Sequence, residues 1–564
     1  MTRLWIALAL GLAGCAAQPV TQVRAPIAPA APVEVQILAI NDLHGNLEPP
    51  APVEIVQNDG SKNKVQTGGV ARLGTALTRL RSGKPNTVTV SAGDSIGASP
   101  LISAYYLDEP TITAMNLMKV EFNAVGNHEF DRGSDELKRI QNGGCTKFTR
   151  RIPCAVEPFR GAEFRYLAAN VRQADGSTIF PGTGLKRFET PAGPITIGFI
   201  GMTLKETSTL VTPSGVKGLT FADEAATANA LVPQLKAQGA DAIVLLIHQG
   251  GKLSKFTSGN GCDGFSGDIE PVLAKVDPAI TTVVSGHTHW AYVCKGTPVT
   301  GPGRLLTSAG KNGYFVTDLR LQFDPATHRL VAQSARNVIV GGGEQGEDAA
   351  QTALVSRYAA AIAPVASKVV GRLSAAAPRD VEDFESAAAD LIADSMLAAT
   401  RDARDGGAQL ALVNATGIRV DLPAGNVRYK DAFAMMPFGN NLLVMTLTGE
   451  QLKRVLEQQY AARVRPGFNR PAALAPSSGF TYAVDMKQPE GSRVSQLRLN
   501  GKAIQPQANY RVVVNNFLAS GGDGLSGFTA GTDVSDPGII DIDAMLAWIA
   551  DGRTPPKADR ITLR

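Results

Sequence analysis

Short apolar runs alternate with stretches of helical periodicity along most of the first 340 residues. Runs rich in β-branched residues that are apolar throughout are typical of strands buried on both faces of a sheet. Such runs occupy residues 35–40, 87–93, 195–202, 242–248 and 280–287. Each ends in a polar or glycine-rich segment, and functional residues of α/β proteins gather at the carboxyl ends of such strands. The pattern predicts an α/β domain whose chemistry lies at these strand ends.

A second domain follows the first. Glycines interrupt the strand pattern at residues 341–343, and residues 348–371 are predicted as a connecting helix with Pro364 near its middle. New helical patterns at 384–401 and 449–463 and new apolar runs at 442–449 and 510–516 come after it. A chain of 564 residues is long enough for such a division. We place the first domain at residues 34–344, a linker helix at 345–370 and the second domain at 371–564.

The N-terminus has the features of an export signal. Arg3 precedes an apolar run over residues 4–12, which is too short to remain as a membrane-spanning helix. Leu-Ala-Gly-Cys at 12–15 resembles a bacterial lipobox, so residues 1–14 would be removed and Cys15 acylated. An ordinary signal with an unrelated cysteine is the alternative. Ala16 favours the outer membrane, and residues 15–33 form an Ala/Pro-rich tether. We expect an exported periplasmic or cell-surface lipoprotein.

The other four cysteines are predicted to form disulfides, because an even number is left in an exported chain. Three pairings are possible, and sequence proximity favours Cys145 with Cys154 and Cys262 with Cys294. A zinc site is the rival interpretation, but no Cys-x-x-Cys spacing supports it.

Charge and composition exclude several classes of protein. Hydrophobic residues make up 44% and charged residues 19%, which is typical of a folded globular chain. Lys+Arg 55 against Asp+Glu 51 leaves a net charge of +4, without a long basic run. We therefore expect no nucleic-acid partner, and no obligate protein partner is predicted.

Five of the six histidines lie in polar clusters at predicted strand ends. The clusters occupy residues 41–46, 93–94, 126–131, 248 and 286–289. A lone histidine at a strand end is more often a packing or capping residue, but Asp, Asn and His at five such ends indicate a metal site. Imidazole, carboxylate and amide oxygen together favour Zn²⁺ or Mn²⁺, and the number of ligands implies two divalent ions.

In chain order these clusters read Asp-x-His, Gly-Asp, Gly-Asn-His-Glu, a single His and Gly-His-x-His. This set resembles the calcineurin-like metallophosphoesterases, and within them the 5′-nucleotidase, UDP-sugar hydrolase and 2′,3′-cyclic nucleotidase family. The resemblance covers nearly all of the chain after the tether. It implies a two-domain α/β fold, with an N-terminal β-sandwich flanked by helices and an α/β C-terminal substrate-binding domain.

The resemblance also assigns roles in the first domain. Asp42, His44, Asp94 and His289 would hold one metal, and Asp94, Asn127, His248 and His287 the other, with Asp94 bridging. His128 and Asp131 would form a catalytic dyad, although a helix-capping carboxylate is the plain alternative for Asp131. Two ions neutralise phosphate oxygens and lower the pKa of a bridging water, whose hydroxide attacks phosphorus in line.

Three glycine-punctuated loops of the second domain would be structural turns without the family. By resemblance, Phe438 and Phe517 stack on the base and Asp523 binds the ribose. Asn414, Arg419 and Arg379 would contact phosphate or ribose, and a solvated surface arginine is the alternative for Arg379. Two departures stand out: residues 415–417 are Ala-Thr-Gly rather than a triple glycine, and Asp383 replaces a second arginine.

These assignments predict an exported dinuclear-metal phosphohydrolase, a 5′-nucleotidase, whose partners are a nucleotide substrate and the membrane through its lipid. The same site would suit 2′,3′-cyclic nucleotides, 3′-nucleotides or UDP-sugars. A silent nucleoside-binding lipoprotein is the non-enzymatic alternative. A relative that hydrolyses a cysteine-bound sulfonate is disfavoured by the phenylalanine pair. Because metals and base contacts lie in different domains, we expect the connecting helix to act as a hinge.

Overall fold

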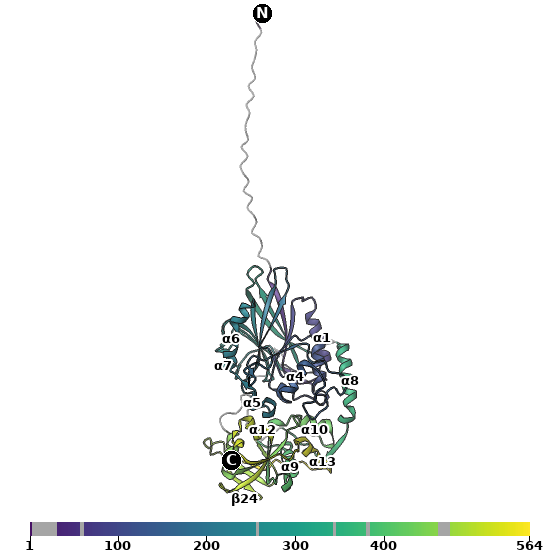
Figure 1. The fold of residues 1–564 in the computed structure, drawn as a ribbon, viewed down its shortest axis with the longest axis vertical. Coiled ribbons are helices and arrows are strands. Elements are labelled where there is room, and N and C mark those ends of the chain that lie inside the picture. The colour runs from purple at the N-terminus through teal and green to yellow at the C-terminus, as the bar shows by residue number, and fades with distance from the viewer. Residues whose placement is uncertain (3–30, 57–60, 255–258, 342–345, 380–383, 461–473) are drawn as a thin grey trace.

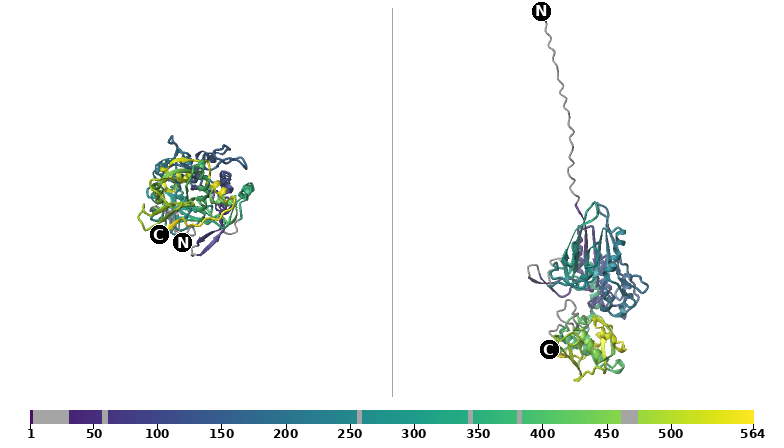
Figure 2. Two further views of the ribbon diagram at one scale, coloured as in Figure 1. Left: turned by 90° about the horizontal axis from the view of Figure 1, so that it is seen from below. Right: turned by 90° about the vertical axis from the view of Figure 1, so that its left-hand side faces the viewer.

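The computed structural model describes residues 1–2, 31–56, 61–254, 259–341, 346–379, 384–460 and 474–564. Its two α/β domains are stacked end to end, which two perpendicular views show (Figures 1 and 2). The predicted two-domain α/β fold is therefore confirmed. The cleavage site, Cys15 and most of the tether fall outside the described residues, as does Asp383. Among the described helices, none has the length and apolar character needed to cross a bilayer.

The first domain is a sandwich of two six-stranded sheets. One sheet has the order β16 (Leu330–Ile339), β15 (Phe315–Phe323), β1 (Val33–Ile40), β4 (Thr87–Ser91), β5 (Phe122–Ala124), β6 (Arg165–Leu167). The other has the order β13 (Ala291–Lys295), β14 (Leu305–Ala309), β12 (Ile280–Ser285), β11 (Ala242–His248), β9 (Ile195–Thr203), β8 (Thr183–Phe188). Because β1, β4 and β5 run parallel, as do β9, β11 and β12, the carboxyl ends within each of these groups lie at one edge.

Strand β1 shows why these apolar runs form a sandwich. Val35, Ile37 and Ala39 belong to the core between the two sheets, and all three are fully buried. Leu38 and Ile40 point the other way, into the core beneath the helices. Both faces of the strand are therefore covered, which explains why its sequence is apolar without alternation.

Helices cover the outer faces of the sandwich, as Figure 1 shows. The core beneath α6 (Glu224–Ala237) and α7 (Glu270–Leu273) includes residues of β9, β11 and β12. The helices α1 (Val70–Arg81), α2 (Leu101–Ala104), α3 (Glu109–Leu117) and α4 (Ser134–Asn142) contribute to the core on the other side.

The connecting helix is shorter than predicted. Helix α8 spans Ala349–Ala366, so Pro364 lies in its last turn rather than near its middle. Residues 369–373 instead form β17 (Val369–Leu373), which pairs with β19 (Gly425–Arg428) of the second domain. Helix α8 packs on the first domain, where the rings of Tyr358 and Tyr106 lie 5.1 Å apart. The chain therefore enters the second domain at the C-terminal end of α8, where proline interrupts helical hydrogen bonding.

The second domain is built on a five-stranded sheet. Its order is β21 (Leu474–Pro476), β18 (Leu410–Asn414), β25 (Asn509–Asn515), β20 (Leu442–Thr448), β26 (Thr532–Ser535). Helix α9 (Ala387–Thr400), which begins three residues later than predicted, and α13 (Asp541–Ile549) pack together. Helix α11 (Gly449–Gln458) contributes to a separate core with β20, β25 and β22 (Phe480–Val484).

The four cysteines of the first domain form two disulfides. Cys145 is joined to Cys154, and Cys262 to Cys294. This is the pairing that sequence proximity favours, and it removes the cysteines from any zinc site.

Candidate metal and nucleotide site

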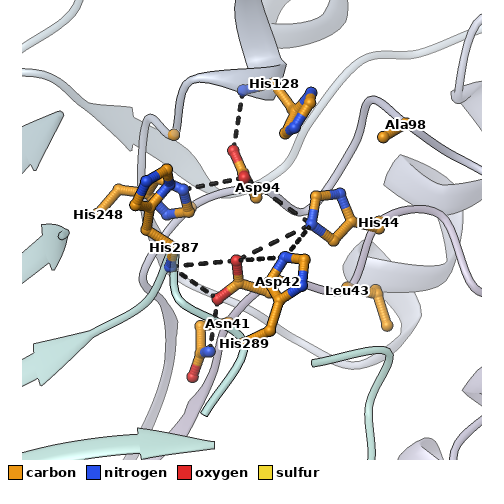
Figure 3. A network of polar contacts seen from close by, with 12 residues as sticks. Asn41, Asp42, Leu43, His44, Asp94, Ala98, His128, His248, His287 and His289 are labelled. Carbon is orange, nitrogen blue, oxygen red and sulfur yellow. Dashed lines mark hydrogen bonds and ion pairs between the residues drawn. The ribbon is translucent and has the colours of Figure 1, made fainter. Parts of the chain in front are cut away.

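The predicted metal ligands converge at the edge where the strands of both sheets end (Figure 3). Their side chains form two groups whose ligating atoms lie within 4.8 Å of one another. The first group is Asp42, His44 and His289, and the second is Asp94, His248 and His287. The loop after β12 contributes to both groups, through His289 to the first and His287 to the second.

In the first group, the side chains face one another but do not complete one another's hydrogen bonds. Nε2 of His44 lies 3.0 Å from Nε2 of His289, so at most one of these nitrogens donates to the other. Nε2 of His289 lies 3.5 Å from Oδ1 of Asp42, and Nε2 of His44 lies 3.9 Å from the same oxygen. One cation between these three side chains would satisfy all of them.

The second group shows the same feature. Oδ2 of Asp94 and Nε2 of His248 are 2.9 Å apart, both atoms are buried, and neither makes a well-directed hydrogen bond. Nδ1 of His287 lies 3.0 Å from Oδ1 of Asn127, which brings the predicted fourth ligand into this group. Oδ2 of Asp94 also lies 3.8 Å from Nε2 of His44, so Asp94 stands between the groups.

Backbone carbonyls fix the tautomers of two of the histidines. Nδ1 of His44 donates to the carbonyl of Gly97 at 2.9 Å, and Nδ1 of His248 donates to that of Ala92 at 2.8 Å. Because a carbonyl only accepts, Nδ1 carries a proton, and in the neutral imidazole Nε2 then presents its lone pair. Such outer contacts orient histidine ligands in metal sites.

The backbone of the site is held in the left-handed region at five of the predicted ligands. Asp42, His44, Asp94, His287 and His289 have φ values of 49°, 47°, 47°, 73° and 63°. Residues other than glycine rarely adopt this backbone conformation, and its cost in free energy is tolerated chiefly at functional sites. Gly126 is required for a different reason, because a Cβ there would lie 2.2 Å from Oδ1 of Asp94.

A buried carboxylate that has no predicted role, Glu129, supports Asp94. Glu129 accepts hydrogen bonds from the backbone N–H groups of Asp94 and Gly126 through Oε2, at 2.9 and 2.6 Å. Its Oε1 accepts from the backbone N–H of Ser95 at 2.9 Å. In the sequence, Glu129 is only the last letter of Gly-Asn-His-Glu. Its contacts with Asp94 and Ser95 join loops more than 30 residues apart and give no local signal.

Burial and opposing charges set the pKa values of the cluster. Burial raises the pKa of Asp42 and lowers that of His44 to about 3. Burial also disfavours the charged form of His248, but Asp94 outweighs it and raises the pKa to about 10. Burial disfavours the charged forms of these carboxylates and imidazoles, while their close contacts favour charge. Divalent cations fit such a buried site, because they bind deprotonated carboxylates and neutral imidazoles. The residues present therefore fit two metal ions.

His128 and Asp131 form a contact beside this cluster. Nδ1 of His128 donates to Oδ2 of Asp131 at 2.9 Å, and the backbone N–H of His128 donates to Oδ1 of Asp94 at the same distance. Burial opposes protonation of His128, but the charges of Asp131 and Asp94 raise its pKa to about 9. Asp131 follows the short 3₁₀ turn η1 (His128–Phe130) and lies at its C-terminal end, so a role as an N-terminal helix cap does not describe it.

A cavity of about 160 Å³ joins this dyad to the second domain. Its lining from the first domain includes Asn127, His128, Asp131 and His287, and from the second Asn414, Arg419, Phe438, Phe517 and Asp523. The rings of His128 and Phe438 lie 6.0 Å apart and nearly parallel. Thr416, Asn440 and Asn515 also line the cavity and were not predicted as site residues.

Positive charge from both domains gathers beside this cavity, from Lys311 of the first domain and from Arg419 and Arg379 of the second. The guanidinium of Arg419 lies 5.6 Å from the ring centre of Phe438. Arg379, which does not line the cavity, donates to the carbonyl of Arg419 at 2.5 Å. Burial and Arg379 lower the pKa of Arg419, while burial and Arg419 lower that of Lys311. Lys311 was not predicted, because its glycine-flanked loop carries no distinctive pattern. An anionic ligand would relieve this repulsion.

Known proteins share both halves of this architecture. The sequence model of the calcineurin-like phosphoesterases matches residues 35–291, and that of the C-terminal domain of 5′-nucleotidases matches residues 366–530. A solved structure of a 5′-nucleotidase precursor from Thermus thermophilus superposes with a TM-score of 0.72. It is 26% identical in sequence, and the match covers 94% of this chain and 99% of that one.

Two relatives that match most of this chain differ in how much of their own length the match covers. The protein named endonuclease YhcR of Bacillus subtilis is 31% identical over 504 residues, which cover 87% of this chain but only 38% of YhcR. The NAD 5′-nucleotidase of Haemophilus influenzae is 26% identical, and the match covers 91% of this chain and 88% of that protein. This chain therefore spans about two fifths of the first relative and most of the second.

Proposed function

Because the chain belongs to the 5′-nucleotidase family of calcineurin-like phosphoesterases, which are metal-dependent phosphoester hydrolases, we propose that it releases phosphate from nucleoside 5′-phosphates. The observation that carries this proposal is the cavity that His128 and Asp131 share with Phe438, Phe517 and Asp523. The residues that we propose for hydrolysis and those that we propose for nucleoside binding line the same cavity. The proposed substrate therefore spans the two domains.

The proposed metal ligands are those that the two clusters bring together. Asp42, His44, Asp94 and His289 would hold one ion, and Asp94, Asn127, His248 and His287 the other. When bound, two divalent ions neutralise phosphate oxygens and supply a water of lowered pKa. Imidazole and carboxylate ligands favour Zn²⁺ or Mn²⁺.

His128 would act on the leaving side of the ester. Asp131 orients its imidazole through Nδ1 and favours its protonated form, so Nε2 can carry a proton toward the 5′ oxygen of the nucleoside. Arg419 would bind the phosphate at this end of the cavity, because the forked donors of its guanidinium match phosphate oxygens. Phe438 lies against both His128 and Arg419, so a base stacked on it would bring its phosphate to this end of the cavity.

The second domain would recognise the nucleoside with little regard for the base. Stacking on an aromatic ring contributes about 1–3 kcal/mol per base and is sequence-tolerant. Phe438 and Phe517 therefore suit several bases, and Asp523 would accept hydrogen bonds from the ribose. Asn414 and Arg379 hold Asp523 and Arg419, respectively, by hydrogen bonds.

We also propose that the chain is exported and held at a membrane by a lipid on Cys15, with the outer membrane favoured. The two disulfides support export, because such bonds persist in oxidising compartments.

The test is phosphate release from 5′-AMP by the purified protein supplied with Mn²⁺ or Zn²⁺, compared with 2′,3′-cyclic AMP and UDP-glucose. We expect 5′-AMP to be hydrolysed fastest and His128→Ala to lower its kcat by about 10²-fold or more. His328→Ala is the matched control, because Nε2 of His328 contacts the carbonyl of Ala192, away from the site. No release from 5′-AMP by protein that binds two metals would overturn the proposal.

A further inference from the structure

Thr416 lies where the family resemblance leads one to expect glycine, and it lines the nucleoside cavity. It belongs to the short 3₁₀ turn η4 (Ala415–Gly417), which follows β18 directly. Both Thr416 and Asp523 line the cavity, although 107 residues separate them in sequence. Oγ1 of Thr416 lies 2.5 Å from Oδ2 of Asp523, so the threonine contacts the carboxylate proposed to bind the ribose.

The direction of this hydrogen bond follows from a chain of contacts that begins at the backbone. The N–H of Leu518 donates to Oδ1 of Asn515 at 2.8 Å, so the NH₂ group of Asn515 must face the other way. It donates to Oδ1 of Asn414 at 3.1 Å. The NH₂ group of Asn414 then donates to Oγ1 of Thr416 at 2.8 Å and to Oδ2 of Asp523 at 3.1 Å.

Because Oγ1 of Thr416 accepts from Asn414, its own proton is directed to Asp523. A hydrogen bond to a carboxylate is about twice as strong as one between neutral groups. Asn414 and Asn515 are both buried, and so the chain of contacts is protected from water. The carboxylate of Asp523 is held at Oδ2 by two donors whose own orientations are fixed.

Asp523 lies in the short 3₁₀ turn η5 (Gly522–Gly524). Its backbone is in the left-handed region at φ 57°, between two glycines. A carboxylate accepts about four hydrogen bonds, so Thr416 and Asn414 do not exhaust it. The carboxylate can therefore accept from a sugar hydroxyl in the cavity while Thr416 keeps it in place.

We propose that Thr416 is a positioning residue that orients Asp523 for the ribose and thereby makes the site selective for nucleotides that carry both ribose hydroxyls. This inference rests on the proposed function, because it assumes that a nucleoside occupies the cavity. Threonine supplies the hydroxyl that glycine lacks. Ribonucleotides should therefore be preferred over 2′- and 3′-deoxyribonucleotides.

The matched variants are Thr416→Val, which keeps the shape and removes the hydroxyl, and Thr416→Ser, which keeps the hydroxyl. For 5′-AMP, we expect Thr416→Val to raise KM by about tenfold with kcat nearly unchanged, the size expected for one charge-assisted hydrogen bond. Its preference for 5′-AMP over the two deoxy analogues should fall toward one. Thr416→Ser should retain the wild-type preference, and thermal unfolding of each variant shows whether it is folded.

Calorimetric binding of adenosine, 2′-deoxyadenosine and 3′-deoxyadenosine separates this inference from the proposed function, since binding needs no hydrolysis. We expect wild type and Thr416→Ser to prefer adenosine, and Thr416→Val to lose that preference. Failure of 5′-AMP hydrolysis with this binding pattern intact would count against the nucleotidase alone. Equal preferences in wild type and Thr416→Val, a serine variant that behaves like valine, or no adenosine binding by wild type would overturn the role of Thr416.

Discussion

Glu129→Gln should destabilise the first domain and loosen the metal site at the same time. The two oxygens of Glu129 accept from three backbone N–H groups at 2.6–2.9 Å, and the side chain is only 3% exposed. A glutamine has one oxygen and one NH₂ group, so in either orientation its NH₂ faces at least one of those N–H donors. The substitution therefore removes at least one hydrogen bond to the side chain and leaves a buried donor without an acceptor.

The size of the effect follows from these two losses. A hydrogen bond contributes about 0.5–1.5 kcal/mol, or about 1.5–3 kcal/mol where the acceptor is charged, and an unsatisfied buried donor costs about 1–3 kcal/mol. Because the two overlap, we expect the free energy of unfolding of the first domain to fall by about 2–4 kcal/mol. The backbone of Asp94 is one of the three donors, so the amount of metal retained after dialysis should fall as well.

Urea unfolding followed by circular dichroism, together with elemental analysis of the dialysed protein, measures both effects. Glu54→Gln is the matched control, because Glu54 is exposed and its ion pair with Lys62 is on the surface. Surface substitutions of this kind change the free energy of unfolding by about 0.5 kcal/mol or less. Wild-type stability and full metal content in Glu129→Gln would refute the argument that this carboxylate supports Asp94.

Three further predictions concern other parts of the chain. Asp131→Asn should lower kcat for 5′-AMP by about 10²-fold without changing the metal content, because the neutral amide no longer favours the protonated form of His128; loss of metal would point to a ligand role instead. Phe517→Ala should raise KM for 5′-AMP by roughly fivefold or more, the lower end of base stacking, while p-nitrophenyl phosphate hydrolysis stays the same; an equal loss on both substrates would contradict stacking. In helix α9, burial raises the pKa of Asp390 to about 9 from its ordinary 3.8. The native chain then holds a proton that the unfolded chain releases, so the stability from this group is present at low pH and lost as pH rises from about 4 through 9. Asp390→Asn should flatten that decline in urea unfolding, and an unchanged slope would contradict it.

The metal cluster could be predicted because each ligand follows a strand closely in sequence. Asp42 and His44 lie just after β1, and His287 and His289 just after β12. Parallel strands carry such residues to one edge, so the local patterns predicted that they gather there, and the family resemblance assigned them to two ions. The buried strands are also visible in the sequence, because strands buried on both faces are apolar throughout, whereas their arrangement as a sandwich was implied by the family resemblance.

The contacts that support the site could not be predicted, because they join distant loops through side chains. In the sequence Thr416 is only a departure from glycine, and its bond to Asp523 spans 107 residues. The predicted end of α8 is wrong because residues from Val369 form a strand that pairs with β19. Val369, Val370 and Gly371 are also poor helix formers, so local propensity and the strand pairing agree that the helix ends before them.

The central claim is that two metal ions and one nucleoside meet in the cavity between the domains. The most direct test is a crystal structure of the Mn²⁺-loaded protein with a non-hydrolysable AMP analogue, using the anomalous signal of manganese. We predict two anomalous peaks, one on each side of Asp94, and a base in contact with Phe438 and Phe517. A single peak, or an analogue bound away from these two rings, would contradict the account.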